Sequence, residues 1–270
     1  TIWRPGEETS RSGSPLMHYS ERQGELLQEE LGESVQVRIA MRYGQPALRR
    51  VMGELMGAGC RRIALIPLYP QYAASSAGTV VDEAARFILA SRNQPELRTI
   101  RSFETAPAYI EGLATALEQH WQVHGRPDPA AGERLLLSFH SIPQAMHDAG
   151  DPYRSECERT AQLLSRRLDL PKGLAQLTFQ SVFGPAAWIG PATIDTVGDL
   201  GRAGCPRLDV ICPGFVSDCL ETLEEINQLN RETFTTAGGG SFHYVPWGND
   251  SDGAIAALAQ QARKVLAGWI

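Results

Sequence analysis

The chain has 270 residues, of which 43% are hydrophobic and 21% charged, so it can bury a large core and is neither disordered nor fibrous. Its net charge of -6, without a run of basic residues, argues against nucleic-acid binding through phosphate neutralisation. Its uninterrupted apolar runs are far shorter than the roughly 20 residues that a membrane-spanning helix requires. These features predict a globular protein of one large or two small domains.

The cysteines indicate the compartment. Five is an odd number in a chain large enough to need no disulfide staples, which is typical of thiols in a reducing compartment, so we expect a cytoplasmic protein. Cys205, Cys212 and Cys219 are evenly spaced, but Pro206 and Pro213 interrupt any helix that would align them. No CxxC pair occurs, so an iron-sulfur or zinc cluster is not expected.

Apolar, β-branched runs alternate with segments of helical periodicity, a pattern that predicts an α/β protein with parallel sheets. The predicted strands, in chain order, are 35–41, 61–68, 97–103, 133–139, 174–181, 207–212 and 241–246. The predicted helices are 18–31, 46–57, 78–91, 107–123, 154–168, 193–203, 218–232 and 252–268.

The two halves of the chain resemble each other. Residues 58–66 and 203–211 share a helix end, a glycine and a strand at a constant offset, and the Gly/Pro/Asp-rich residues 125–132 predict a linker between the halves. Two strands precede the repeated strand in the second half, whereas only 35–41 precedes it in the first. A duplicated unit would then place a strand before Thr1, and the alternative of a chance similarity stays open.

Ligands of open α/β sheets bind beyond the carboxyl ends of the strands, where this chain places unusual residues. The residues that follow the predicted strands include Arg42, Tyr43, Tyr69, Tyr72, His140, Ser141, Trp188 and Phe215. If the two halves share a cleft, these side chains gather around it.

His140 and Glu221 are the candidate catalytic and metal-binding residues. His140 follows an apolar strand, where its ring can point into a cleft, although a lone histidine there is often structural. Asp218, Glu221 and Glu225 share one face of a predicted helix start, and Glu221 is the one expected to point inward. An imidazole and a carboxylate can both accept protons near neutral pH and both bind a borderline divalent metal.

On these residues the sequence resembles the ferrochelatases, enzymes that insert Fe(II) into a porphyrin. The resemblance extends over nearly the whole chain and includes several separate motifs in the family's order. These are Gly13-Ser14-Pro15-Leu16, Met41-Arg42-Tyr43-Gly44, Leu68-Tyr69-Pro70-Gln71-Tyr72, Ser138-Phe139-His140-Ser141-Ile142-Pro143, Phe183-Gly184-Pro185 with Trp188, and residues 213–226. The segment around Asp218-Cys219 is similar to the proteobacterial branch, in which cysteine replaces a histidine of animal enzymes.

The resemblance implies a fold of two similar Rossmann-like three-layer domains with parallel sheets and a porphyrin cleft between them. One domain would comprise 1–126 with the last helix, 252–270, and the other 133–251.

The resemblance also implies insertion of Fe(II) into protoporphyrin IX to form haem, with porphyrin and ferrous iron as partners and no cofactor beyond the substrate iron. It makes His140 and Glu221 the catalytic and metal-binding pair, and assigns porphyrin contacts to Arg42, Tyr43, Ser141 and Trp188.

Alternatives stay open at this stage. They are a chelatase for another metal or tetrapyrrole, since one His and one Glu do not fix the metal, and a non-catalytic tetrapyrrole- or metal-binding relative. A hydrolase is disfavoured because no nucleophile elbow is present. Val182 stands where the family usually has a basic residue, and the family's opening strand and glycine-rich loop are not in this sequence. The sequence does not distinguish protoporphyrin from coproporphyrin as the substrate. It also leaves open a peripheral membrane contact and the oligomeric state.

Overall fold

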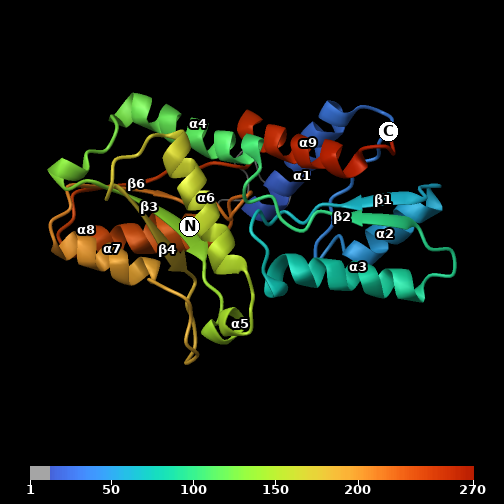
Figure 1. The fold of residues 1–270 in the computed structure, drawn as a ribbon, viewed down its shortest axis with the longest axis horizontal. Helices are drawn as coiled ribbons and strands as arrows, with labels where there is room; N and C mark the ends of the chain where they lie inside the picture. The colour runs from blue at the N-terminus through green and yellow to red at the C-terminus, as the bar shows by residue number, and fades with distance from the viewer. Residues whose placement is uncertain (1–12) are drawn as a thin grey trace.

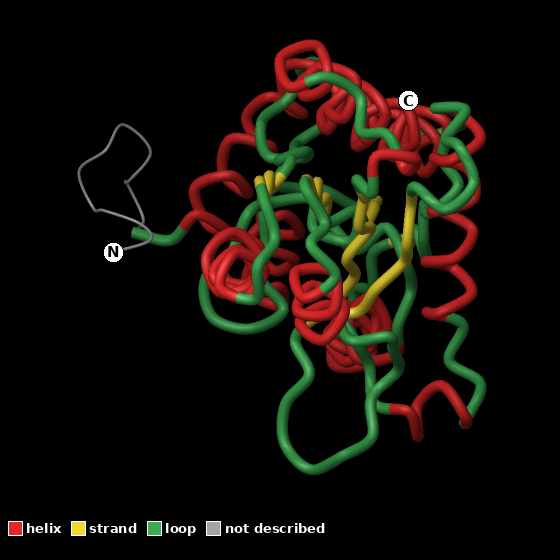
Figure 2. The backbone as a smooth tube through the Cα atoms, turned by 90° about the vertical axis from the view of Figure 1, so that its left-hand side faces the viewer, coloured by secondary structure: helices red, strands yellow, loops and turns green. Residues whose placement is uncertain are grey.

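The computed structural model describes residues 13–270, which form two parallel β-sheets with helices on both faces (Figures 1 and 2). The smaller sheet pairs β1 (Arg62–Leu65) with β2 (Glu96–Thr99). The larger sheet has the order β4-β3-β5-β6 and is parallel throughout. Its strands are β3 (Arg134–His140), β4 (Ala175–Gln180), β5 (Arg207–Ile211) and β6 (Ser241–Tyr244). The predicted α/β class with parallel sheets is confirmed.

Most predicted helices are present with shifted ends, but 218–232 is divided into a π-helical segment, η3, and the helix α8. The helices are α1 (Pro15–Leu31), α2 (Leu48–Gly57), α3 (Thr79–Ala90), α4 (Pro107–His124), α5 (Gln144–Asp148), α6 (Tyr153–Arg167), α7 (Thr193–Arg202), α8 (Arg231–Thr236) and α9 (Asp252–Leu266). Shorter or wider turns form η1 (Ala74–Gly78), η2 (Pro129–Ala131) and η3 (Glu221–Asn230). The sequence did not predict α5 or η1.

The larger sheet lies in the middle of three layers because alternate residues of β3 point to opposite faces. Leu135, Leu137 and Phe139 are buried in the core that α4 and α6 cover. Leu136 is buried in a second core with residues of α7, η3 and α8. Each such leucine contributes roughly 1.5–3 kcal/mol through burial, so both faces stabilise the sheet.

The smaller sheet is covered in the same way. Ile63 and Leu65 pack with residues of α2 and α3, whereas Ala64 packs with the core that includes α9. Arg62 pairs with Glu96, and Arg207 pairs with Ser241, so β1–β2 and β5–β6 have the same register at the same sequence offset. The two sheets therefore share one supersecondary unit, as the internal similarity predicted.

The predicted strand 35–41 is not formed. Only Met41 makes an isolated bridge, with Ala47, and the backbone at Val35 and Val37 is hydrogen-bonded by the side chain of Gln28 instead. A cavity separates residues 34–40 from β1. An alternating pattern produces extended backbone, but a strand also needs a neighbouring ladder, and in the described residues β1 pairs only with β2. A strand before Thr1 stays a prediction.

Helix α9 packs against α4, α1 and β1, which places the end of the chain beside its first half (Figure 1). The contact of α9 with α4 is close because two glycines face each other. A Cβ added to Gly253 would lie 2.9 Å from Gly112 Cα. Because α4 also covers the larger sheet, this contact does not assign α9 to one half, and the grouping of 252–270 with 1–126 stays a prediction. Residues 1–12 lie outside the described part. Within residues 13–270, no helix is long and apolar enough to cross a membrane.

Candidate active site

A cavity of about 880 Å³ is lined by residues from both halves of the chain. The first half contributes Arg42 and Tyr69, and the second contributes Phe215, Cys219 and Glu221. From these residues the cavity continues between residues 34–40 and β1. Both halves therefore line one space, but most of its lining belongs to the first half, and the porphyrin cleft stays a prediction.

Tyr69 lies at the centre of the polar side of this cavity. Its phenol pKa is raised, first by burial and then by the proximity of Tyr43, Glu221 and Cys219, while Arg42 acts in the opposite direction. The guanidinium of Arg42 stacks 4.5 Å from the centroid of the Tyr43 ring, and its Nε donates to Thr79 O at 2.9 Å. Three predicted site residues, Arg42, Tyr43 and Glu221, are thus brought together.

The sequence motifs contained Tyr69, but it was not selected as a site residue. Tyr69 could have been selected from the sequence, because it follows a predicted strand, as Arg42 and His140 do. Because its phenol remains protonated near neutral pH, Tyr69 can donate a hydrogen bond beside the Glu221 carboxylate.

Glu221 is the first residue of η3 and is partly exposed. Its carbonyl oxygen accepts a hydrogen bond of 2.7 Å from Gln180 Nε2, at the end of β4. Gln180 Oε1 in turn accepts from the hydroxyl of Ser138, in β3, at 2.7 Å. The adjacent Cys219 has a raised thiol pKa, caused first by burial and then by the charge of Glu221 and a hydrogen bond to it. The start of η3 is therefore held by the end of β4 and, through Gln180, by β3, the strand that ends at His140.

Asp218 and Glu225, which were predicted to share a helix face with Glu221, have structural roles. Asp218 is 6% exposed and accepts hydrogen bonds from Tyr244, Thr222 and Asn249. Glu225 accepts from both the backbone N–H and the hydroxyl of Ser181, at 2.6 Å each. Ser181 has a φ of 63°, so Glu225 holds a strained turn directly after β4. Of the three, Glu221 alone lines the cavity, as expected.

His140 ends β3, where it pairs in register with Gln180. Its Nδ1 lies 2.6 Å from the carbonyl oxygen of Ser141, which leaves Nε2 as the outward ring nitrogen. The ring lies 6.4 Å from that of Phe215, a residue that lines the cavity, but His140 is not itself among the lining residues. That His140 and Glu221 act on one metal centre stays a prediction.

Ser141 and Trp188 are held by contacts of their own. Ser141 is 1% exposed and its hydroxyl donates to Ile189 O at 2.8 Å, which connects the turn after β3 to the segment that carries Trp188. Trp188 Nε1 donates to Phe183 O at 2.9 Å, and its ring lies 4.7 Å from that of the exposed Phe183. The porphyrin contacts assigned to Ser141 and Trp188 stay predictions.

The segment after β1 connects the two halves. Gln71 Nε2 donates to Tyr109 OH at 3.0 Å and to Thr160 Oγ1 at 2.9 Å. The backbone N–H of Tyr72 donates to the buried carboxylate of Glu156 at 2.7 Å. Gln71 and Tyr72, which follow Tyr69 in the same motif, therefore hold the two halves in position.

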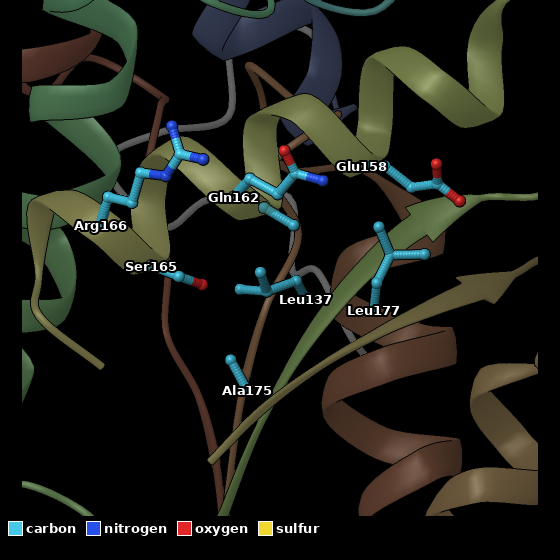
Figure 3. A pocket seen from close by; sticks show the side chains of 8 residues that line it. Leu137, Glu158, Gln162, Ser165, Arg166, Ala175 and Leu177 are labelled. Atoms are coloured by element: carbon cyan, nitrogen blue, oxygen red, sulfur yellow. The ribbon is translucent and has the colours of Figure 1, made fainter. Parts of the chain in front are cut away.

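A shallower hollow of about 440 Å³ lies between α6 and strands β3 and β4 (Figure 3). Leu137, Ala175 and Leu177 form its apolar part, with Glu158 and Arg166 among its polar residues. Leu137 pairs with Leu177, well before His140 and Gln180 in the same ladder, so the hollow lies away from the site end of the sheet. It contains no predicted site residue.

Two solved structures share this fold. One is "SirB from Bacillus subtilis with Fe3+", at a TM-score of 0.65 and 16% identity, covering 95% of this chain and 93% of that one. The other is the sirohydrochlorin chelatase SirB of Bacillus subtilis subspecies spizizenii in complex with cobalt, at a TM-score of 0.59 and 13% identity, covering 93% and 91%. The architecture is therefore that of the Rossmann-like chelatases.

The sequence comparisons are more specific. The model of the ferrochelatase family matches residues 7–266. The ferrochelatase of Dechloromonas aromatica is 46% identical over 272 residues, covering 100% of this chain and 72% of that protein. The ferrochelatase of Aromatoleum aromaticum is 48% identical over 265 residues, covering 97% and 71%. The chain belongs to the ferrochelatase family, and it is a metal chelatase.

Proposed function

We propose that this protein inserts Fe(II) into protoporphyrin IX, the reaction that forms haem. The observation that carries the proposal is one cavity, lined by both halves, that gathers Arg42, Tyr69 and Glu221. The ring of Phe215, which also lines it, lies 6.4 Å from that of His140. Membership of the ferrochelatase family supports the same reaction. Iron enters and remains ferrous, so the reaction needs no redox or organic cofactor.

The reaction exchanges two pyrrole protons for one metal ion, so the site needs proton acceptors close to where the metal enters. We propose that His140 accepts pyrrole protons through Nε2, since its Nδ1 is engaged at the carbonyl oxygen of Ser141. Glu221 then binds the incoming ion or passes protons toward solvent, because it is partly exposed and lines the cavity.

Binding energy from the rest of the macrocycle assists this exchange. Distorting the porphyrin out of its plane exposes the nitrogen lone pairs, and contacts far from the metal can offset that strain. Arg42 and Tyr43 stack on each other at the first-half side of the cavity, where a cation and an aromatic face suit an anionic, aromatic substrate. The exposed Phe183 and the half-buried Trp188 are proposed to contact the porphyrin from the second half.

The test is anaerobic insertion of Fe(II), with Zn(II) as a surrogate, into protoporphyrin IX, followed by visible absorption. We expect His140→Ala and Glu221→Gln each to lower the insertion rate by about 100-fold or more while porphyrin still binds. Glu224→Gln is the matched control, because Glu224 is exposed on the same segment and should leave the rate unchanged.

A His140→Ala protein that retained the wild-type rate would overturn the assignment. Parallel assays with coproporphyrin III and with Co(II) determine which porphyrin and metal are preferred. Porphyrin binding without insertion by the wild-type chain would instead indicate a non-catalytic relative. We also propose a cytoplasmic location, which the five free thiols support.

A further inference from the structure

Histidines outside the proposed active site gather on the α4 face of the larger sheet. His120 and His124 lie one turn apart on α4, Asp209 is in the middle of β5, and His243 is its registered neighbour in β6 (α4 and β6 are labelled in Figure 1). One ligand atom from each of His120, Asp209 and His243 lies within 4.8 Å of the others. Among residues 13–270, this is the one group of three such side chains with converging ligand atoms.

The separations approach those of a metal centre. His243 Nδ1 is 3.0 Å from Asp209 Oδ1, and His120 Nε2 is 3.5 Å from the same oxygen. Ligands at about 2.1 Å from a tetrahedral zinc ion are about 3.4 Å apart, so small side-chain rotations would bring these atoms around one ion.

His120 provides an independent sign of a missing ligand. Its Nε2 is buried and makes no hydrogen bond within the described residues, because 3.5 Å to Asp209 is too long for a good one. A buried polar atom of this kind costs free energy unless a partner satisfies it.

Hydrogen bonds hold the carboxylate of Asp209 in place. Arg207 and Trp121 donate to Oδ2 at 2.8 and 2.9 Å, whereas Oδ1 faces both histidines and also accepts from Arg207 Nε. Arg207 shares its charge with the carbonyl oxygens of His124 and Gly125 at the end of α4, which moderates its repulsion of a second cation.

We propose that His120, Asp209 and His243 bind a divalent transition-metal ion of the zinc type, separate from the substrate metal. Two imidazoles and one carboxylate suit Zn²⁺ and its neighbours and disfavour Mg²⁺ or Ca²⁺. His124 is exposed, and its ring lies 4.5 Å from those of His120 and His243, but its nitrogens are not among the converging ligand atoms, so water would complete the coordination. Such an ion connects α4 to β5 and β6.

The site is distant from the catalytic residues. Asp209 is level with Leu135 in the ladder, five residues before His140 on β3. At about 3.3 Å per residue, this places the two sites about 16 Å apart along the strand. An ion here does not contact the porphyrin cavity, so its binding can be measured independently of turnover.

The experiment uses a chain with His140→Ala and Glu221→Gln, so that binding at the active site is weakened. We expect this protein to bind one equivalent of Zn²⁺ in calorimetry and to give the visible bands of tetrahedral Co²⁺. Adding either His120→Gln or His243→Gln should weaken binding by at least about 10-fold and abolish the bands. His147→Gln, on α5, is the control and should change neither.

The proposal is overturned if the His140→Ala, Glu221→Gln chain binds no Zn²⁺, or if His120→Gln leaves its affinity unchanged. In that case the histidines and Asp209 form a hydrogen-bonded cluster only. Circular dichroism of each variant separates loss of ligand from loss of fold. Insertion activity does not enter this measurement, so failure of the proposed function would not decide it.

Discussion

The pKa of the Cys219 thiol depends in part on the charge of Glu221. Its raised pKa keeps it protonated near neutral pH, first through burial and then through the Glu221 carboxylate. Because the thiolate is the reactive form, we expect Cys219 to react slowly with iodoacetamide. Glu221→Gln removes the negative charge, so the Cys219 pKa should fall and its alkylation should accelerate several-fold.

Peptide-level mass spectrometry measures this rate, with Cys60 in the same protein as an internal control, because it is partly exposed and precedes β1, whereas Tyr69, which is affected by the charge of Glu221, follows the other end of that strand. An unchanged Cys219 rate in Glu221→Gln would mean that the carboxylate does not influence the thiol. The measurement needs neither porphyrin nor iron, so it examines the geometry of the site alone.

Single residues were predicted unevenly from the sequence. The strand-end rule identified His140, which ends β3, because the rule depends only on parallel topology. Arg42 and Tyr43 were selected at the end of predicted strand 35–41, which does not form, so their selection rested on a wrong element. Glu221 was separable from Asp218 and Glu225 by helical spacing. That Ser141 is buried, and that Gln71 connects the halves, depends on contacts between residues distant in sequence, which no local pattern encodes.

At the scale of elements, the crossing of α4 and α9 depends on two glycines. A Cβ on Gly253 would meet Gly112 Cα at 2.9 Å, so Gly253→Ala must push the helices apart and should lower the free energy of unfolding by about 1–3 kcal/mol. Gly53→Ala, inside the exposed face of α2, is the matched control. Its nearest atom would be 3.9 Å away, so it should stabilise by roughly 0.5–1 kcal/mol.

Urea denaturation of both variants provides the comparison. Equal effects of the two substitutions would show that the α4–α9 crossing can relax without cost. A loss confined to Gly253→Ala would confirm that backbone proximity, and not helix propensity, determines the result.

Elements were predictable where periodicity and pairing agreed. Strands β3 to β6 combine apolar runs with neighbours on the sheet, and they form close to their predicted ranges. Residues 35–41 have the pattern without the pairing, and they remain extended. The π-helical η3 was read as an ordinary α-helix because both bury similar apolar spacings, and α5 is too short to show a period.

At the scale of the whole molecule, a buried carboxylate joins the two halves. Glu156 is 1% exposed and accepts from Tyr72 N and from Arg101 Nη1, each at 2.7 Å. Glu156→Gln keeps the shape but removes the charge opposite Arg101. We expect it to lower the free energy of unfolding by about 2–4 kcal/mol, because the remaining donors lose a charged acceptor.

Thermal unfolding with porphyrin titration tests this prediction, with Glu158→Gln as the control, since Glu158 is exposed on the same helix. Weaker porphyrin binding by Glu156→Gln alone would show that the alignment of the halves shapes the cavity. A stability equal to the wild type would mean that the backbone contacts around Gln71 are sufficient.

The position of α9 also determines when the molecule can fold during synthesis. Arg98 donates to the carbonyl oxygens of Val265 and Ala267, and Arg263 pairs with Glu30, so the smaller sheet and α1 are completed by residues of α9 and the turn after it. On the ribosome, β3 to β6 emerge before α9. The larger sheet can therefore assemble first, while apolar surface of the smaller sheet and α1 stays uncovered until α9 has been synthesised.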